Sequence, residues 1–237
     1  MLRAGVIGLG DMGSGLAKNL IKNGITTTGL DLNDERMNAF VEMRGTPAGS
    51  VAELGTNSDA VFVMVMNGIQ AKAVILGDDG LVAHMPKGGA VILTATIKPS
   101  EARYIGTALE GSGIHLIDSP VSGGFPGAQA GTLTMMAAAT SEVLDQYKPI
   151  MDAVSKTIHR VGTQAGDGQV MKSCLQTLIG SIFGATFEAA ALAAKAGVSG
   201  QALYDVFSTS GASCGVANGA LENIIDRKFE GTGSGIG

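Results

Sequence analysis

The chain has little of several residue types on which particular protein classes depend. Its 237 residues include two cysteines, three histidines and no tryptophan, and only 16% of them are charged. Cys174 and Cys214 form neither a disulfide framework nor a metal-ligand pattern, so we expect no bound metal and a cytoplasmic location. Lysine and arginine are not clustered and the net charge is −5, so nucleic acid is not an expected partner.

Long apolar runs are also missing. No stretch of about 18 residues is free of polar interruption, which predicts that no segment spans a membrane. The chain enters its first apolar run at Ala4 without a signal-peptide pattern. Hydrophobic residues nevertheless make up 45% of the chain, so we expect a sizeable core in one large or two modest domains.

Short apolar runs alternate with helical patterns over the first two thirds of the chain. This alternation predicts right-handed crossovers and a mainly parallel sheet, in which ligands bind beyond the carboxyl ends of the strands. The fold class we predict is α/β, with a Rossmann-type sheet in residues 1–163. The expected strands are residues 4–7, 26–31, 59–66, 90–96, 115–118 and 132–139.

Strand patterns stop near Gly162, and a C-terminal all-helical domain is predicted from residue 164 to residue 237. Its first helix, expected over 167–195, carries no charge between Ser173 and Phe187. A helix that is apolar on most faces must be buried on most faces. We therefore expect it between the domains and against a partner subunit of a homo-oligomer, a dimer or tetramer. We also expect it to be too polar and too short to span a bilayer.

The first strand runs into a glycine turn and then a helical pattern. In Gly8-Leu9-Gly10-Asp11-Met12-Gly13 the glycines permit a tight turn, close approach of a pyrophosphate and close helix packing. Asp31, at the end of the second strand, is placed to accept hydrogen bonds from an adenosine ribose and to repel a 2′-phosphate. The alternative is a glycine turn beside a surface aspartate. We predict an NAD site, whose contacts are Gly8, Leu9, Gly10, Asp11, Met12, Gly13, Asp31, Met66 and Thr96.

Lys172 lies in the first turns of the nearly uncharged helix. Burial of an ammonium group without a partner lowers its pKa, and such a lysine can exchange a proton with a substrate hydroxyl. Gln176 lies four residues further on, on the same helix face, where its amide could hold the substrate oxygen or orient the lysine. Spacing alone leaves open a lysine that simply extends from the helix end to water.

A second group of residues follows the strand at 115–118. Ser122, Gly123 and Gly124 combine a hydroxyl with successive backbone N–H groups, which suits a substrate carboxylate. The alternative is an ordinary glycine turn. Asp118, at the start of this stretch, is expected to be structural.

Three motifs in this order resemble the β-hydroxyacid dehydrogenase family. GLGDMGSGLAKNL, residues 8–20, matches the family's GLGxMGxxxAxNL. DSPVSGG (118–124), followed by a GTL at 131–133, matches its substrate loop, and GDGQVMK (166–172) matches its catalytic GxGxxxK. The resemblance implies that Lys172 is catalytic and that NAD oxidises a small 3-hydroxy acid.

The chain departs from the family pattern in two places. The usual Asn-Asn after the lysine is replaced by Leu175 and Gln176, and glutamine at the second position is more similar to the L-threonate branch. Family members usually run to about 290 residues, so the resemblance implies that the helical domain is incomplete. The expected substrate is 3-hydroxyisobutyrate-like or L-threonate-like. The alternatives are a non-catalytic dinucleotide-binding module and a semialdehyde reductase working in the reverse direction.

Overall fold

A computed structural model describes residues 2–228 of the chain. Two compact units are present, Met1–Lys172 and Ser173–Gly237. Helix α9 (Asp167–Lys195) begins in the first unit and continues in the second. The predicted domain division at residue 163 falls just before this helix, and it stays a proposal.

The first unit has the predicted Rossmann-type α/β architecture. Its strands are β1 (Ala4–Ile7), β2 (Thr27–Leu30), β3 (Thr46–Pro47), β4 (Ala60–Val63), β5 (Ala90–Leu93), β6 (His115–Asp118), β7 (Val121–Ser122), β8 (Leu133–Ala138) and β9 (Ser155–Gly162). Its helices, besides the start of α9, are α1 (Asp11–Lys22), α2 (Asp34–Glu42), α3 (Val51–Thr56), α4 (Gly68–Leu76), α5 (Leu81–His84), α6 (Pro99–Leu109), α7 (Gly124–Ala130) and α8 (Ser141–Asp152).

All these strands belong to one sheet, in the order β3-β2-β1-β4-β5-β6-β8-β7, with β9 paired to β8. Strands β1 to β6 are parallel to one another, whereas β8 is antiparallel to both β6 and β7. The mainly parallel sheet predicted from the sequence is therefore confirmed. The direction of winding reverses between β1 and β4, which is where sheets of this kind form their binding crevice.

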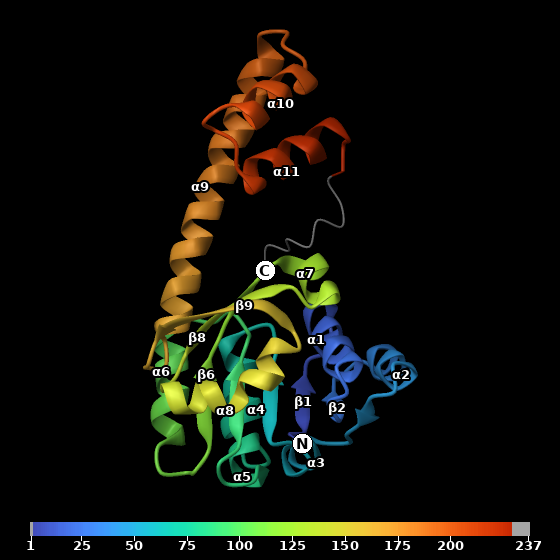
Figure 1. The fold of residues 1–237 in the computed structure, drawn as a ribbon, viewed down its shortest axis with the longest axis vertical. Coiled ribbons are helices and arrows are strands. Elements are labelled where there is room, and N and C mark those ends of the chain that lie inside the picture. The colour runs from blue at the N-terminus through green and yellow to red at the C-terminus, as the bar shows by residue number, and fades with distance from the viewer. Residues whose placement is uncertain (1, 229–237) are drawn as a thin grey trace. The chain divides into compact units, whose positions relative to one another are not determined.

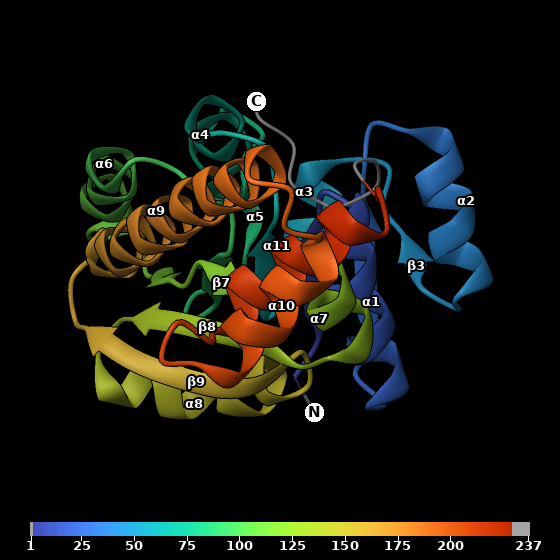
Figure 2. The ribbon, with the colours of Figure 1, turned by 90° about the horizontal axis from the view of Figure 1, so that it is seen from above.

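The central strands supply side chains alternately to two cores. Phe62 and Ile92 pack in a core with residues of α1, α2 and α8, whereas Val61 and Leu93 pack in a core with residues of α3, α4, α5 and α6. Figure 2 shows α8 on one side of the strands and α4 and α6 on the other. Because both faces are covered, these strands are continuous apolar runs in the sequence.

Two predicted strands end earlier than expected. Strand β4 ends at Val63 and β5 at Leu93, so Met66 and Thr96 lie in the loops that follow them. The sequence analysis also missed β3, β7, β9, α5 and α7. Strand β9 is mostly exposed and begins beside polar residues, and the other missed elements are only two to seven residues long.

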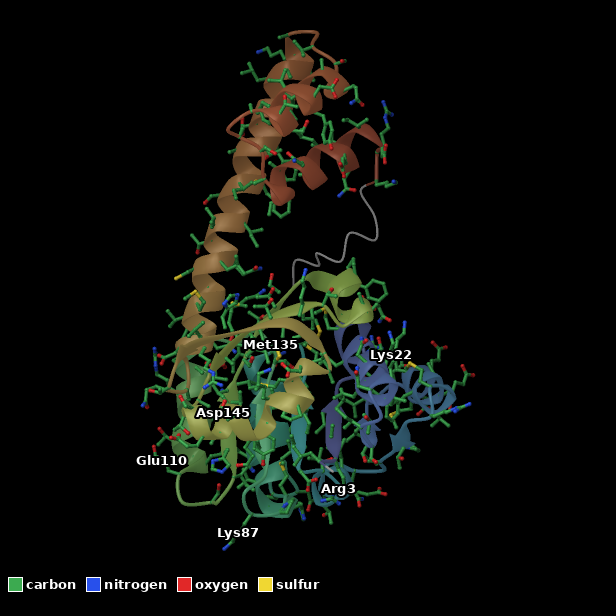
Figure 3. The ribbon with its side chains drawn as sticks, in the orientation of Figure 1. Arg3, Lys22, Lys87, Glu110, Met135 and Asp145 are labelled. Carbon is green, nitrogen blue, oxygen red and sulfur yellow. The ribbon has the colours of Figure 1, made fainter. Side chains whose placement is uncertain are left out.

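The first unit leaves most of its charged side chains on the surface and buries apolar ones inside. Arg3 lies before β1 at the amino-terminal edge and pairs with Asp59 at 2.8 Å (Figure 3). Met135 of β8 is fully buried and lies opposite Val121 of β7. This pairing fixes β7, a strand of two residues that leads into α7.

The second unit consists of the rest of α9 with α10 (Gly200–Thr209) and α11 (Gly215–Ile225), labelled in Figure 1. The expectation that α9 is too short and too polar for a bilayer is wrong. The helix has 29 residues and its most apolar 18-residue window has a mean hydropathy of 1.5, enough by length and composition to cross a membrane. The core helix of a soluble protein passes the same test, so the property does not assign a location.

Candidate active site

The carboxyl ends of β1, β4, β5 and β6 meet at one edge of the sheet, because these strands are parallel neighbours. The loops after these four strands contain most of the residues that the sequence analysis selected. This edge is therefore the candidate active site.

The turn after β1 has the geometry of a phosphate-binding loop. Gly8 has a φ of +88°, and a Cβ there would lie 2.2 Å from the Met64 carbonyl oxygen. A Cβ on Gly13 would lie 1.7 Å from the Gly8 carbonyl oxygen, so a larger residue is excluded at both positions. Gly10 caps α1 without a side-chain hydrogen bond, which leaves the N–H groups of the first turn for an anion. These residues fit a pyrophosphate.

Asp31 follows β2 and reaches back to the same turn. Its carboxylate accepts hydrogen bonds from the N–H of Leu9 at 2.6 Å and from the N–H of Asn33 at 2.9 Å. Leu9 itself is buried, so this bond ties the phosphate turn to β2. The carboxylate is thereby fixed at the place where the ribose of a dinucleotide binds in folds of this type.

Arg36 of α2 is a neighbour of this carboxylate that the sequence analysis did not single out. Its Nη1 lies 3.5 Å from Asp31 Oδ2, and its guanidinium carbon would lie 3.6 Å from a Cβ on Gly10. A positive charge therefore stands beside both the glycine turn and the Asp31 carboxylate, the predicted ribose contact. The sequence signal that could have identified Arg36 is an arginine on the helix that follows the acidic residue.

Three large apolar side chains are exposed at this edge of the sheet. Leu32 follows β2, Met66 follows β4, and Ile69 lies in the first turn of α4. Because β2 and β4 flank β1, these side chains stand on the two sides of the phosphate turn. They offer apolar surface to a planar base, and Met66 stays a predicted cofactor contact.

Lys172 lies in the second turn of α9 and is 9% exposed. Its Nζ donates a hydrogen bond to the carbonyl oxygen of Val121 at 2.8 Å. Within residues 2–228 no carboxylate lies within ion-pair distance of this ammonium group. Burial therefore lowers the pKa of Lys172 below the usual range of a lysine.

The contact with Val121 brings two of the predicted groups together. Val121 precedes Ser122 in β7, and Gly123 and Gly124 follow with φ values of +129° and +58°. Such φ values favour glycine and turn the chain sharply into α7. Lys172 is thus held one residue from the predicted carboxylate-binding loop.

Helix α7 is itself fixed against α1. The Asn19 side chain donates hydrogen bonds to the carbonyl oxygens of Gly15 at 2.8 Å and Ala128 at 2.9 Å. A Cβ on Gly15 would lie 2.5 Å from the Ala128 backbone, so only glycine permits this close approach. Helix α1 therefore carries the predicted phosphate-binding turn at one end and supports α7, which follows the predicted substrate loop, along its side.

A buried polar network surrounds the start of α9. Asp118, fully buried at the end of β6, accepts hydrogen bonds from the N–H of Gly166 at 2.8 Å and from the Gln169 side chain at 2.9 Å. Gln169 also donates to the Ala95 carbonyl oxygen at 3.1 Å and accepts from the Ile97 N–H at 3.0 Å. Burial raises the pKa of Asp118, although the N–H donors oppose that shift. The sequence analysis missed Gln169, which lies within the motif GDGQVMK.

Two predicted residues are less directly placed. Thr96 is exposed between Ala95 and Ile97, in the loop after β5. Gln176 is exposed on α9 in the second unit, four residues beyond Lys172. Their roles toward the nicotinamide ribose and the substrate stay predictions.

The fold, the glycine turn and the acidic residue after β2 define a dinucleotide-binding protein. Residues 3–162 match a family model described as the NAD binding domain of 6-phosphogluconate dehydrogenase. Residues 166–234 match one described as NAD-binding of NADP-dependent 3-hydroxyisobutyrate dehydrogenase.

Curated relatives and solved structures agree with these matches. L-threonate dehydrogenase of Cupriavidus necator is 36% identical, over 93% of this chain and 74% of the relative. 3-Hydroxyisobutyrate dehydrogenase of Pseudomonas aeruginosa is 34% identical, over 86% of this chain and 68% of the relative. The crystal structure of 3-hydroxyisobutyrate dehydrogenase from Salmonella typhimurium is 31% identical with a TM-score of 0.86, over 96% of this chain and 79% of that chain.

The chain therefore belongs to the β-hydroxyacid dehydrogenase family. It is an NAD-dependent 3-hydroxyacid dehydrogenase, as the sequence analysis predicted, and its substrate is a small molecule.

Replacement of Asp31 by serine is expected to lower the preference for NAD over NADP by at least about 10-fold. The substitution removes a ribose acceptor and a charge that repels a 2′-phosphate, and it leaves Arg36 in place. The ratio of kcat/KM with the two cofactors measures the effect. Asp34→Ser, which removes an exposed charge from the first turn of α2, is the matched control. An unchanged ratio in Asp31→Ser would contradict the assignment of Asp31 to the ribose.

Proposed function

We propose that this enzyme oxidises a small 3-hydroxy acid with Lys172 as the general base. The observation that carries the proposal is the hydrogen bond from Lys172 Nζ to the Val121 carbonyl oxygen, because it holds a buried lysine beside Ser122. A lysine with a lowered pKa has a larger neutral fraction near neutral pH than an ordinary lysine. The neutral amine is the form that accepts a proton.

In the proposed reaction Ser122, Gly123 and Gly124 bind the substrate carboxylate and Gln176 positions the substrate. The proton of the substrate hydroxyl passes to Lys172 Nζ while hydride leaves the carbon that carries this hydroxyl, so the alcohol becomes a carbonyl. NAD, when bound, supplies the nicotinamide ring that accepts the hydride. Gly8 to Gly13 and Asp31 would hold its pyrophosphate and ribose. In the reverse direction Lys172 returns the proton, so the same residues serve a semialdehyde reductase.

We propose L-threonate, or an acid with similar hydroxylation, as the preferred substrate. Several relatives at 31–36% identity are named L-threonate dehydrogenase, and they cover 93–95% of this chain. Gln176, in place of the asparagine common in the family, supports the same choice. We also propose a cytoplasmic location, as for a soluble metabolic enzyme.

A substrate panel tests the proposal through absorbance of the reduced cofactor. It contains 3-hydroxyisobutyrate, L-threonate, glycerate, serine and phenylserine, each with NAD and with NADP. Turnover is expected with NAD and at least one of these acids, and Lys172→Met is expected to lower kcat by about 10²- to 10⁴-fold. The unfolding temperature of Lys172→Met should not fall, since the substitution removes a buried amine.

Lys22→Met, at an exposed position in the last turn of α1, is the matched control for this substitution. Normal turnover by Lys172→Met would disprove its role as the base. NAD binding without turnover of any acid would favour the non-catalytic alternative.

The pH dependence should follow the protonation state of Lys172. Oxidation requires the neutral amine, so kcat/KM for the acid is expected to rise with pH. Reduction requires the ammonium form, so kcat/KM for the carbonyl product is expected to fall over the same range. Because burial lowers the pKa of Lys172, the midpoint should lie below the usual lysine value of about 10.4. Rate profiles measured in both directions on one preparation check this, and parallel profiles would contradict it.

We further propose that the enzyme is a homo-oligomer that covers the apolar surface of α9. Leu178, Phe187 and Leu192 of this helix are each more than half exposed, and only 6% of its most apolar window is buried. Light scattering at micromolar concentration is expected to give a dimer or tetramer. Leu192→Glu should shift the distribution toward the monomer, since a charge would lose hydration at the interface. A monomeric parent protein would contradict the proposal.

A further inference from the structure

The structure assigns a positioning role to the buried pair Asp118 and Gln169, which we propose sets the position of Lys172 relative to the loop of Thr96. The inference rests on the proposed role of Lys172 as the base. Both side chains are almost completely buried, and their hydrogen bonds run to the start of α9 and to the loop of Thr96. They therefore act through the residues that they hold.

Asp118 acts on the start of α9. Its Oδ2 accepts hydrogen bonds from the backbone N–H groups of Gly166 at 2.8 Å and Gln169 at 3.2 Å. The first N–H groups of a helix lack partners within the helix, and a carboxylate there is also stabilised by the helix dipole. Asp118 thus fixes the first turn of the helix that carries Lys172.

The two glycines of this segment make the contact possible. Gly166 has a φ of +98°, which favours glycine. A Cβ on Gly168 would lie 2.5 Å from the Asp118 carbonyl oxygen and 2.7 Å from that of Met136. Any larger residue would therefore displace α9 from β6 and β8, and Lys172 with it.

Gln169 links the helix to the cofactor side of the site. Its side chain donates to the Ala95 carbonyl oxygen and accepts from the Ile97 N–H, the two neighbours of Thr96. It also donates to Asp118 Oδ1 at 2.9 Å. Gln169 lies one turn before Lys172 on α9. One amide group therefore joins the loop predicted to touch the nicotinamide ribose to the helix turn that precedes the base.

The chemistry explains why the pair is sensitive to substitution. Both carboxylate oxygens of Asp118 accept hydrogen bonds from N–H groups. An asparagine at this position would therefore place its NH₂ group against an N–H donor. A carboxylate at position 169 would face Asp118 and could not donate to Ala95. Either change leaves buried polar groups unpaired and allows the turn to shift. A displacement of about 1 Å at a reacting group can cost about 10²-fold in rate.

The test compares Asp118→Asn and Gln169→Glu with the parent enzyme. Each is expected to lower kcat by about 10- to 100-fold, with little change in the KM for NAD. The deuterium isotope effect on kcat should rise, because the hydride step becomes rate-limiting. Hydrogen exchange at the amides of residues 166–169 should be faster in Asp118→Asn without any substrate present.

A double-mutant cycle with Lys172→Ala separates positioning from general damage. If Asp118 acts through Lys172, then Asp118→Asn costs no further rate when Lys172 is already absent. Asp59→Asn provides the matched control. It changes a hydrogen-bonded carboxylate at the opposite edge of the sheet and should leave kcat unchanged.

The exchanged pair, Asp118→Asn with Gln169→Glu, keeps the test decisive if a single variant does not fold. In this double variant the amide introduced at position 118 can donate to the carboxylate introduced at position 169, so the contact between the two side chains is rebuilt with reversed polarity. The Ala95 carbonyl oxygen still lacks its donor, so the recovery should be partial, and no recovery at all would count against the proposal. We expect the kcat of the double variant to exceed that of either single variant, or to be measurable if neither single variant folds. The positioning proposal is overturned if the single variants keep full kcat, or if Asp118→Asn costs as much without Lys172 as with it. Full activity of Lys172→Ala would instead overturn the proposed base.

Discussion

A buried carboxylate, that of Asp118, holds the start of the helix that carries Lys172. Asp118 has no exposure, and burial raises its pKa, because an ionised carboxylate loses its hydration there. The backbone N–H groups of Gly166 and Gln169 and the Gln169 amide offset that loss. The arrangement satisfies helix donors and carboxylate oxygens together. Removal of either partner would leave the other buried and unpaired.

Helices α1 and α9 both begin at the carboxyl edge of the parallel strands, and their N-termini are used in opposite ways. Helix α1 begins at Gly10 without a side-chain cap, which leaves its first N–H groups for the phosphates of a dinucleotide. Helix α9 has its own carboxylate, Asp118, at the corresponding position. The start of α1 is left open to an external anion, whereas an internal carboxylate occupies the start of α9 and holds the turn before Lys172. Glycine permits the close approach at both, through Gly13 and Gly168.

The parts of the structure that were predictable from the sequence are those with a local signal. The central strands are buried on both faces, so their apolar runs were recognisable, and the turn after β1 needs glycines at fixed positions. Strand β9 was missed because its exposed side chains give no apolar run. Strand β7 was missed because two residues form no pattern, and its position depends on pairing with Met135 and Thr134.

The candidate site shows the same limit, since the Val121 carbonyl that Lys172 contacts lies 51 residues away in the chain. The importance of Asp118 and Gln169 likewise comes from contacts between β6, the loop after β5 and α9, which no spacing rule within one segment contains.

The ionisation of Lys172 links the stability of the fold to the proposed reaction. Because its pKa is lowered in the folded state, the unfolded chain binds the proton more tightly than the folded one. The burial penalty is complete at pH values below the folded pKa, where the lysine is charged in both states. This penalty declines as pH rises through the folded pKa toward the usual lysine value, since the folded state then holds a neutral amine.

The neutral form that the proposed oxidation needs is thus also the form that the fold accommodates best. Protonation of Lys172 by a substrate hydroxyl therefore drives the site toward its less stable state. A substrate carboxylate bound at Ser122 would counter this by stabilising the ammonium group. The proposed reaction therefore needs the proposed carboxylate-binding loop and the lysine to be adjacent, and the hydrogen bond between Lys172 and Val121 keeps them so.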